Sequence, residues 1–83
     1  MRLGEGVEAH DIDGSIVLTG PGGEAATLNE TASIAFGALL DGEGAKGVSR
    51  LLAERYEVGV ESARLDVEEM IGRLAATGMV VLL

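Results

Sequence analysis

The sequence predicts an α+β fold in which a three-stranded antiparallel sheet precedes three helices. Short stretches of alternating or β-branched residues, separated by glycine-containing turns, occupy residues 7–28. This pattern is typical of strands. Apolar residues recur at three- and four-residue steps over residues 30–77, the spacing of amphipathic helices. Strands that are followed by helices, rather than alternating with them, favour an α+β arrangement.

Three strands are expected before residue 29. Residues 7–10 alternate apolar and polar side chains, and residues 15–19 form a β-branched run. Between them, Asp13 and Gly14 can take the positive φ angles of a tight hairpin. Residues 20–23 read GPGG and predict a second turn. Residues 24–28 then form the third strand, which lies at an edge of the sheet.

Three helices are expected after the sheet. The short polar side chain of Asn29 can cap a helix over residues 30–40, and the acidic, glycine-containing stretch 41–44 ends that helix. A second helix is expected over residues 45–56 and a third over residues 60–77, where one apolar face is committed to the core.

The two ends of the chain carry different signals. Residues 1–6 contain two glycines without periodicity and predict a flexible lead-in. Gly78 can take the left-handed conformation that ends a helix. Residues 79–83 read MVVLL and are expected to pack on the body or add a short strand. At 83 residues the chain is expected to be a single small domain.

Composition excludes several kinds of partner. Six basic residues stand against 14 acidic ones, for a formal net charge of -8, which repels phosphate backbones and anionic lipids. Phe36 and Tyr56 are the only aromatic residues, too few for a platform that stacks nucleic-acid bases. No stretch has the length of a membrane span or the pattern of a secretion signal. We therefore expect a cytoplasmic protein with no nucleic-acid or membrane partner.

Catalytic, metal and cofactor sites are not expected. The chain has no cysteine, and His10 is its only histidine, so neither a metal site nor a nucleophilic relay can be completed. We interpret His10 as structural or incidental. The serines stand in no nucleophile-elbow motif, and GPGG lacks the lysine of a phosphate-binding loop.

The third predicted strand is unusual for an edge strand. Ala25, Ala26 and Thr27 are small and uncharged, whereas exposed edges are usually protected by lysine, proline or a bulge. The strand therefore either pairs with a partner peptide or is buried under the last helix. If the Ala26 N–H faces such a guest, a proline at this position should abolish binding.

Charged residues on the last predicted helix fall into two groups. Helical spacing places Glu61 and Glu68 away from the apolar stripe, which indicates a solvated face. A second, mixed group borders the stripe around Met70: Asp66, Glu69 and Arg73. Glu69 and Arg73 have the spacing of a stabilising i,i+4 ion pair. This border fits either the rim of a groove or an ordinary solvated surface.

Three segments together resemble a known family. They are LNETASIAFGALLDG at 28–42, LLAERYEV at 51–58, and A-x-x-D-V-x-x-M-I-x-x-L-x-x-x-G at 63–78. With this spacing the chain resembles the PqqD-like fold, the recognition element for precursors of ribosomally synthesised and post-translationally modified peptides. It is most similar to the discrete leader-binding B1 proteins of lasso peptide systems. Gly44 and Gly59 replace the usual helix-capping residues, and the tryptophan-containing end of the pyrroloquinoline quinone pathway member is missing.

The resemblance implies a winged helix-turn-helix arrangement and a function. In this family the leader of a precursor peptide adds as a strand to the third strand, in the cleft beside the third helix. The resemblance implies the following peptide-binding residues: Glu24, Ala25, Ala26, Thr27, Leu28, Asp66, Glu69, Met70, Arg73 and Thr77. It further implies a non-catalytic adaptor that presents the leader to a maturation enzyme such as a leader peptidase.

Four alternatives remain at this point. One is a PqqD-type peptide chaperone for a radical SAM enzyme. Another is a winged-helix DNA-binding regulator, which would need a basic recognition helix, whereas residues 60–77 carry more acids than bases. An acyl-carrier-like protein would be all-helical, and a small hydrolase would need catalytic residues that the chain does not supply.

Overall fold

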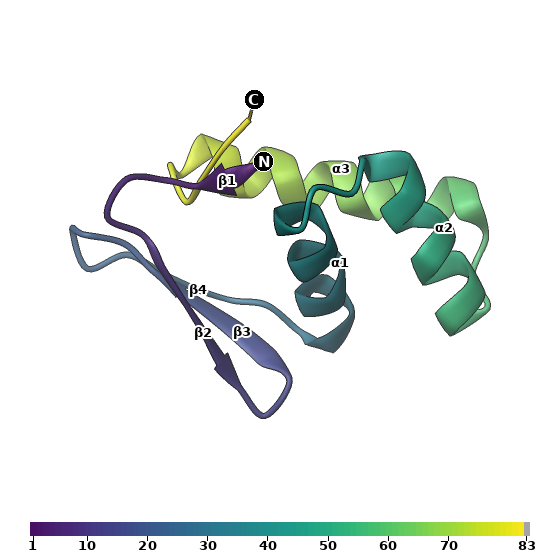
Figure 1. Ribbon diagram of the computed structural model, residues 1–83, viewed down its shortest axis with the longest axis horizontal. Helices are drawn as coiled ribbons and strands as arrows, with labels where there is room; N and C mark the ends of the chain where they lie inside the picture. Colours follow the sequence, from purple (N-terminus) through teal and green to yellow (C-terminus); the bar gives the residue numbers. More distant parts are fainter. Residues whose placement is uncertain (83) are drawn as a thin grey trace.

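The computed structural model describes residues 1–82, which form five strands and three helices (Figure 1). In chain order these are β1 (Arg2–Leu3), β2 (Glu8–Ile12), β3 (Ser15–Thr19), β4 (Ala25–Thr27), α1 (Glu30–Leu40), α2 (Ala45–Tyr56), α3 (Val60–Ala76) and β5 (Val80–Val81). The predicted α+β winged helix-turn-helix arrangement is confirmed.

The strands β2, β3 and β4 form an antiparallel sheet in that spatial order. Asp13 and Gly14 join β2 to β3 with φ angles of 53° and 85°, the positive values that a two-residue hairpin turn requires. The predicted meander, with its third strand at an edge, is confirmed. Its outer strands differ in extent from the prediction, since β2 begins at Glu8 and continues to Ile12, while β4 covers only Ala25–Thr27.

The two ends of the chain pair with each other as a second, two-stranded sheet. Arg2 lies opposite Val81 and Leu3 opposite Val80. The prediction of a flexible lead-in is therefore wrong for Arg2 and Leu3, because their partner strand is distant in sequence and local patterns do not reveal it. The expectation that residues 79–83 pack on the body or add a short strand is confirmed, since Met79 and Val80 are buried and Val80–Val81 form β5. Leu83 lies outside the described residues.

Close backbone approach explains one glycine in this second sheet. The Gly4 N–H donates to the Met79 carbonyl at 2.9 Å. A Cβ atom at Gly4 would lie 2.0 Å from the Gly78 carbonyl oxygen, so a side chain at this position would push the two ends apart. Met79 and Val80 are both buried, and the terminal pairing therefore closes one side of the core.

Helix boundaries follow the capping chemistry in the sequence. The Asn29 side chain accepts a hydrogen bond of 2.8 Å from the Ala32 N–H and caps α1. The helices α2 and α3 begin after Gly44 and Gly59, neither of which supplies a side-chain cap. Gly78, with φ of 78°, ends α3. The predicted helix bounds agree with the structure except that α3 stops at Ala76, one residue early.

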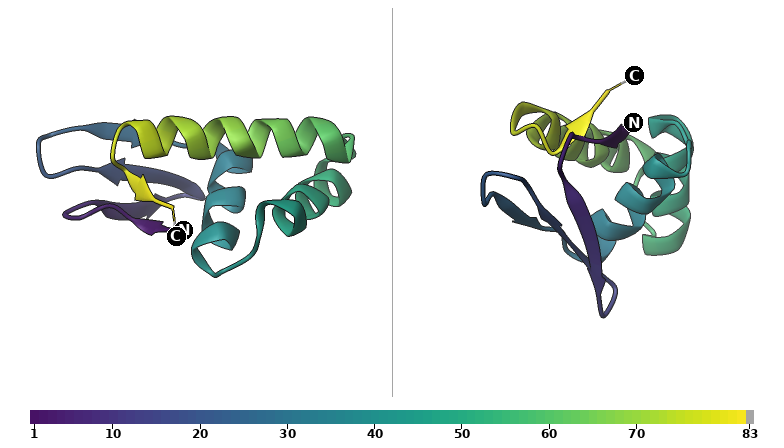
Figure 2. Two further views of the ribbon diagram at one scale, coloured as in Figure 1. Left: turned by 90° about the horizontal axis from the view of Figure 1, so that it is seen from above. Right: turned by 60° about the vertical axis from the view of Figure 1, so that its left-hand side comes forward.

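The core lies where α1 meets the sheet and the other helices. Phe36 of α1 and Leu18 of β3 are fully buried, together with Val48 of α2 and Val67 of α3. In Figure 2, α3 runs along the length of the molecule, with its N-terminal part near α2 and its C-terminal part near the sheet. This placement puts one face of α3 near β4.

Candidate functional site

One backbone hydrogen bond next to each end of β4 defines how this strand bonds to β3. The Leu28 N–H donates to the Ile16 carbonyl at 2.8 Å, and the Gly20 N–H donates to the Glu24 carbonyl at 2.8 Å. The register pairs Val17 with Thr27 and Thr19 with Ala25. Continued by one residue at each end, it puts Ile16 opposite Leu28 and Gly20 opposite Glu24. Both are therefore hydrogen-bonded pairs, and they set the alternation of bonding between them.

This alternation decides which backbone groups of β4 face outward. Ala26 lies opposite Leu18, midway between the two bonded pairs, so its N–H and carbonyl point toward β3. The N–H and carbonyl groups of Ala25 and Thr27 point away from β3. Within residues 1–82, no turn, cap or side-chain hydrogen bond occupies the N–H of Ala25 or Thr27. The outer edge of β4 is therefore open. The Ala26 N–H does not face a guest, so the outward amides that a proline could remove are those of Ala25 and Thr27.

A buried serine fastens the end of β4 to α1. Ser33 is only 5% exposed. Its hydroxyl donates to the Leu28 carbonyl at 3.2 Å and accepts from the Ile16 N–H at 2.8 Å. One side chain thus satisfies a β3 donor and a β4-end acceptor, which fixes the position of the open edge relative to the helices. The sequence analysis missed this role, although a serine within the apolar stripe of α1 was a usable signal.

A hollow of about 180 Å³ lies between β4 and the C-terminal part of α3. It is lined by residues of the strand and of α3: Ala26, Thr27, Leu28, Met70, Arg73, Leu74 and Thr77. Leu28, Met70 and Leu74 are buried members of the core. Its floor is therefore apolar, while Arg73 and Thr77 are exposed.

A second hollow of about 230 Å³ continues along α3 toward α1 and α2. The lining residues are Asn29, Thr31, Ala32, Ala35, Leu52, Asp66, Val67, Glu69, Met70 and Arg73. Met70 and Arg73 line both hollows. We call the two together the β4–α3 groove, which extends from the open strand edge to the first turn of α1.

Most of the predicted site residues lie in this groove. Ala26, Thr27 and Leu28 come from the strand side, and Asp66, Glu69, Met70, Arg73 and Thr77 come from α3. Two predicted residues line neither hollow. Ala25 instead contributes backbone groups to the open edge, and Glu24 precedes β4, with its carboxylate 3.4 Å from the Gly22 N–H in the turn.

The sequence analysis did not foresee the helical residues at the far end of the groove. Thr31, Ala32 and Ala35 come from the first turns of α1, and Leu52 comes from α2. The position of α1 directly after the edge strand was a signal for the first three. Leu52 reaches the groove only through the packing of α2 against α3, which no local pattern specifies.

The charged residues of α3 are arranged differently on its two sides. On the solvent side Arg64 bridges Glu61 and Glu68, with 2.7 Å to the Glu68 carboxylate. The hydrogen bond from Arg64, and secondarily its charge, lower the pKa of the Glu61 carboxyl. The predicted solvated face for Glu61 and Glu68 is confirmed, since their side chains are 73% and 51% exposed.

On the groove side the expected Glu69–Arg73 ion pair is not formed. Within residues 1–82 the charged atoms of these two side chains do not come within the 4.0 Å of a salt bridge. Both side chains line the groove and are exposed. An exposed ion pair is weak, so hydration of the two separate charges competes with pairing. The i,i+4 spacing of Glu69 and Arg73 was therefore not enough to predict a salt bridge.

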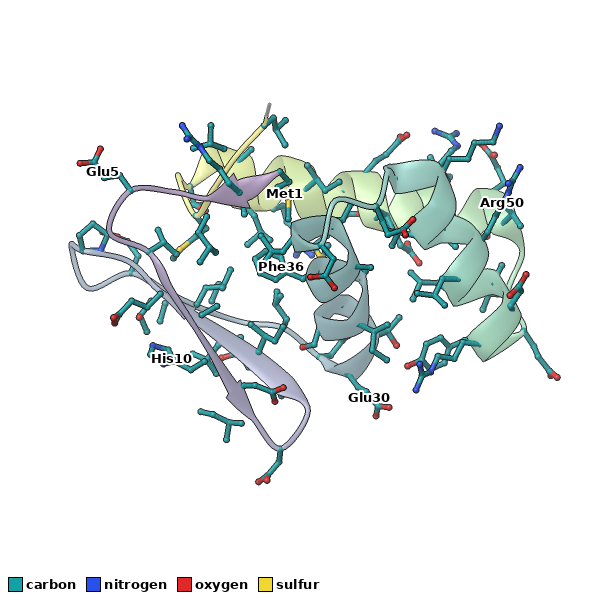
Figure 3. The ribbon with its side chains drawn as sticks, in the orientation of Figure 1. Met1, Glu5, His10, Glu30, Phe36 and Arg50 are labelled. Atoms are coloured by element: carbon teal, nitrogen blue, oxygen red, sulfur yellow. The ribbon has the colours of Figure 1, made fainter. Side chains whose placement is uncertain are left out.

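The remaining candidate groups lie apart from the groove. His10 is exposed on β2 (Figure 3), with its Nε2 atom 3.2 Å from the Thr19 hydroxyl and 3.9 Å from the Glu8 carboxylate. No group of three potential metal-ligating side chains is found among residues 1–82. In the same part of the chain, no helix combines the length and hydrophobicity needed to cross a bilayer.

The fold and the groove define a class of protein: a winged helix-turn-helix domain in which an open sheet edge faces a groove along the last long helix. The family model described as "Coenzyme PQQ synthesis protein D (PqqD)" matches residues 14–80. The chain therefore belongs to the PqqD family, and the resemblance found in its sequence is confirmed. A search of curated proteins returned no match.

Two solved structures are similar over nearly their whole length. "Lasso peptide synthetase B1 complexed with the leader peptide" is 32% identical, with a TM-score of 0.90, and the match covers 98% of this chain and 96% of that one. "TbiB1 in Complex with the TbiA(beta) Leader Peptide" is 20% identical, with a TM-score of 0.86 and coverage of 95% and 93%. At that lower identity the second match supports the fold alone.

Proposed function

We propose that this protein is a non-catalytic adaptor of lasso peptide biosynthesis. It binds the leader segment of a ribosomally made precursor and presents the precursor to a maturation enzyme such as a leader peptidase. The observation that carries the proposal is the open outer edge of β4 beside the β4–α3 groove. An extended peptide could add there as a further strand and place side chains in the groove.

The backbone part of this interaction involves Ala25 and Thr27. Each offers one outward N–H and one outward carbonyl to the guest. At roughly 1 kcal/mol net for each hydrogen bond, these four groups contribute about 4 kcal/mol. Ordering a flexible leader costs about 2–5 kcal/mol. Backbone pairing therefore offsets little more than the ordering cost, and side-chain contacts must supply the affinity.

The groove offers those side-chain contacts. Leu28, Met70 and Leu74 give the hollow beside β4 an apolar floor, so an apolar guest side chain gains free energy by entering it. The second hollow adds an apolar surface from Ala35 and Val67, with charged side chains at its rim. Every second side chain of the added strand would point to the same face of the sheet, so one such set would reach the groove.

The relatives support this choice of guest. The structure that is 32% identical to this chain is described as a lasso peptide synthetase B1 complexed with the leader peptide, and its match spans almost all of both chains. The PqqD family match favours a second candidate of the same kind, a peptide chaperone that serves a radical SAM enzyme. The two differ in the enzyme that receives the peptide, and both use the same groove.

A role in DNA regulation is disfavoured by charge. A DNA-binding winged helix needs a basic face on its recognition helix. Here the exposed face of α3 pairs its Arg64 with two carboxylates, and the chain carries a formal net charge of -8. We also propose that the protein has no catalytic residue, cofactor or metal, and that it acts in the cytoplasm.

Isothermal titration tests the proposal directly. The titrant is a synthetic peptide with the leader sequence of the precursor gene that neighbours the gene for this chain, and the matched control is a scrambled peptide of equal composition. We expect saturable binding with a dissociation constant of about 10 µM or tighter, some 7 kcal/mol, for the leader alone. Absence of heat and of competition at tens of micromolar would reject the leader-binding role.

A further inference from the structure

Among the described residues 1–82, Arg73 is the only cation that lines the β4–α3 groove. It borders both hollows and therefore lies where they meet. Within residues 1–82 it makes no salt bridge, although Glu69 lies one helical turn earlier. Four other cations form no salt bridge to any group of residues 1–82 and line neither hollow: Arg2, Lys46, Arg50 and Arg55. Position in the groove, rather than the lack of an ion pair, distinguishes Arg73.

The charges along the groove are unevenly distributed. Asp66 and Glu69 line only the hollow near α1 and α2, whereas Arg73 also lines the hollow beside β4. A negative guest side chain is repelled near the two carboxylates and attracted near the guanidinium. The preference for such a side chain therefore changes along the path of the guest.

Strand addition alone does not fix the register of the guest. Backbone bonds are the same for every side chain, and a shift by two residues keeps the same face of the guest toward the groove. The outward groups of Ala25 and Thr27 would accept either register equally well. A contact with a particular side chain has to select one of them.

We infer that Arg73 sets the register of the bound peptide by pairing with one Asp or Glu side chain of the leader. This inference rests on the proposed leader-binding function and adds a specificity-determining residue to it. Bidentate pairing with a carboxylate suits the planar guanidinium. Guests shifted toward Asp66 and Glu69 would instead place that carboxylate near like charge, which disfavours the wrong register.

The test uses fluorescence anisotropy with a labelled synthetic leader from the neighbouring precursor gene. Each Asp or Glu of the peptide is replaced in turn by Asn or Gln, and every peptide is titrated with the wild type and with Arg73→Gln. We expect one substitution to weaken wild-type binding by about 3- to 10-fold at low salt. The same substitution should have no further effect on Arg73→Gln, because the paired charge is already gone.

The matched control is Arg64→Gln, which removes a cation of the same helix that lies outside the groove. We expect this variant to bind the leader within about twofold of the wild type. A charge exchange, with Arg73→Glu and the selected peptide acid changed to Lys, should recover most of the lost affinity. Circular dichroism confirms that each variant is folded.

Two results separate the inference from the function on which it rests. If the leader binds and Arg73→Gln binds it as tightly as the wild type, or if Arg64→Gln weakens binding equally, the register role of Arg73 is wrong and the adaptor function stands. If the unmodified leader does not bind the wild type at all, the proposed function fails, and the inference fails with it.

Discussion

The two edges of the three-stranded sheet, β2 and β4, differ in ways that separate an ordinary edge from a binding edge. Every residue of β2 is exposed, and its side chains include Glu8, His10 and Asp11. The β4 edge is shorter and carries only alanine and threonine. Charged side chains hinder the approach of another strand, so β2 is protected from pairing and β4 is not.

The two edges also differ in what lies beside them. The backbone of β2 has outward groups of its own, because Ala9 lies opposite Leu18, whose hydrogen bonds go to β4. Neither hollow of the β4–α3 groove has a β2 residue in its lining. Free backbone groups are therefore insufficient for a site. An adjoining apolar wall, here supplied by α3, is what distinguishes β4.

The largest expected effect comes from breaking the inner side of β4. Ala26→Pro removes the N–H that faces the fully buried Leu18. The Leu18 carbonyl then loses its hydrogen-bond donor. We expect a loss of about 3 kcal/mol in the free energy of unfolding, measured by urea denaturation. The control Ala25→Pro removes an outward N–H, so its stability should change by less than about 1 kcal/mol. Equal losses would mean that the assigned bonding alternation is wrong.

Next in size is the link between β4 and α1. Ser33→Ala leaves the part-buried Ile16 N–H without an acceptor, whereas the Leu28 carbonyl keeps the Ser15 hydroxyl as a donor. We expect a loss of about 2 kcal/mol in the free energy of unfolding. Ser49→Ala is the matched control, because Ser49 is also buried but bonds only to the Ala45 carbonyl within its own helix. It should lose about 0.5 kcal/mol, and the reverse order would contradict the linking role of Ser33.

The outer sides of the two edges can be compared directly in leader binding. Ala25→Pro removes one outward donor of β4, and Ala9→Pro removes one outward donor of β2. We expect Ala25→Pro to weaken binding about 10-fold, or some 1.4 kcal/mol, and Ala9→Pro to leave the dissociation constant unchanged. Titration of both folded variants checks this. If only Ala9→Pro weakened the complex, the guest would bind the β2 edge and the assignment to β4 would be contradicted.

The smallest expected effect concerns the cap that follows β4. Asn29→Ala removes the side-chain acceptor for the Ala32 N–H and should cost about 1 kcal/mol in the free energy of unfolding. Asn29→Asp keeps an acceptor at this position and should retain most of the stability. Thermal unfolding monitored by circular dichroism distinguishes the two. No loss in the alanine variant would show that the cap contributes little to α1.

Local patterns predicted the three-stranded sheet and the three helices well, because each of these elements has its own periodicity, turn or capping residue. Asn29 predicted the start of α1 and Gly78 the end of α3, while Asp13 and Gly14 predicted the hairpin. The pairing of Arg2–Leu3 with Val80–Val81 could not be predicted, because the partners are far apart in sequence and each strand has only two residues.

The family resemblance predicted most of the β4 and α3 residues of the candidate site, but neither its α1 and α2 residues nor its detailed geometry. Spacing on α3 placed Met70 and Arg73 on one side, and both line the groove. Which amides of β4 face outward depends on the alternation of bonds with β3, and composition carries no information about it. The prediction of a Glu69–Arg73 ion pair was wrong for another reason. The conformations of exposed side chains depend more on hydration than on sequence spacing.

Amide hydrogen exchange, measured by nuclear magnetic resonance with and without saturating leader peptide, tests the added strand most directly. If a guest pairs with β4, exchange of the Ala25 and Thr27 amides should slow by at least about 10-fold on binding, while the amides of Ala9 and Asp11 on β2 keep their rates. A saturated complex in which the Ala25 and Thr27 amides exchange as fast as in the free protein would contradict strand addition at β4.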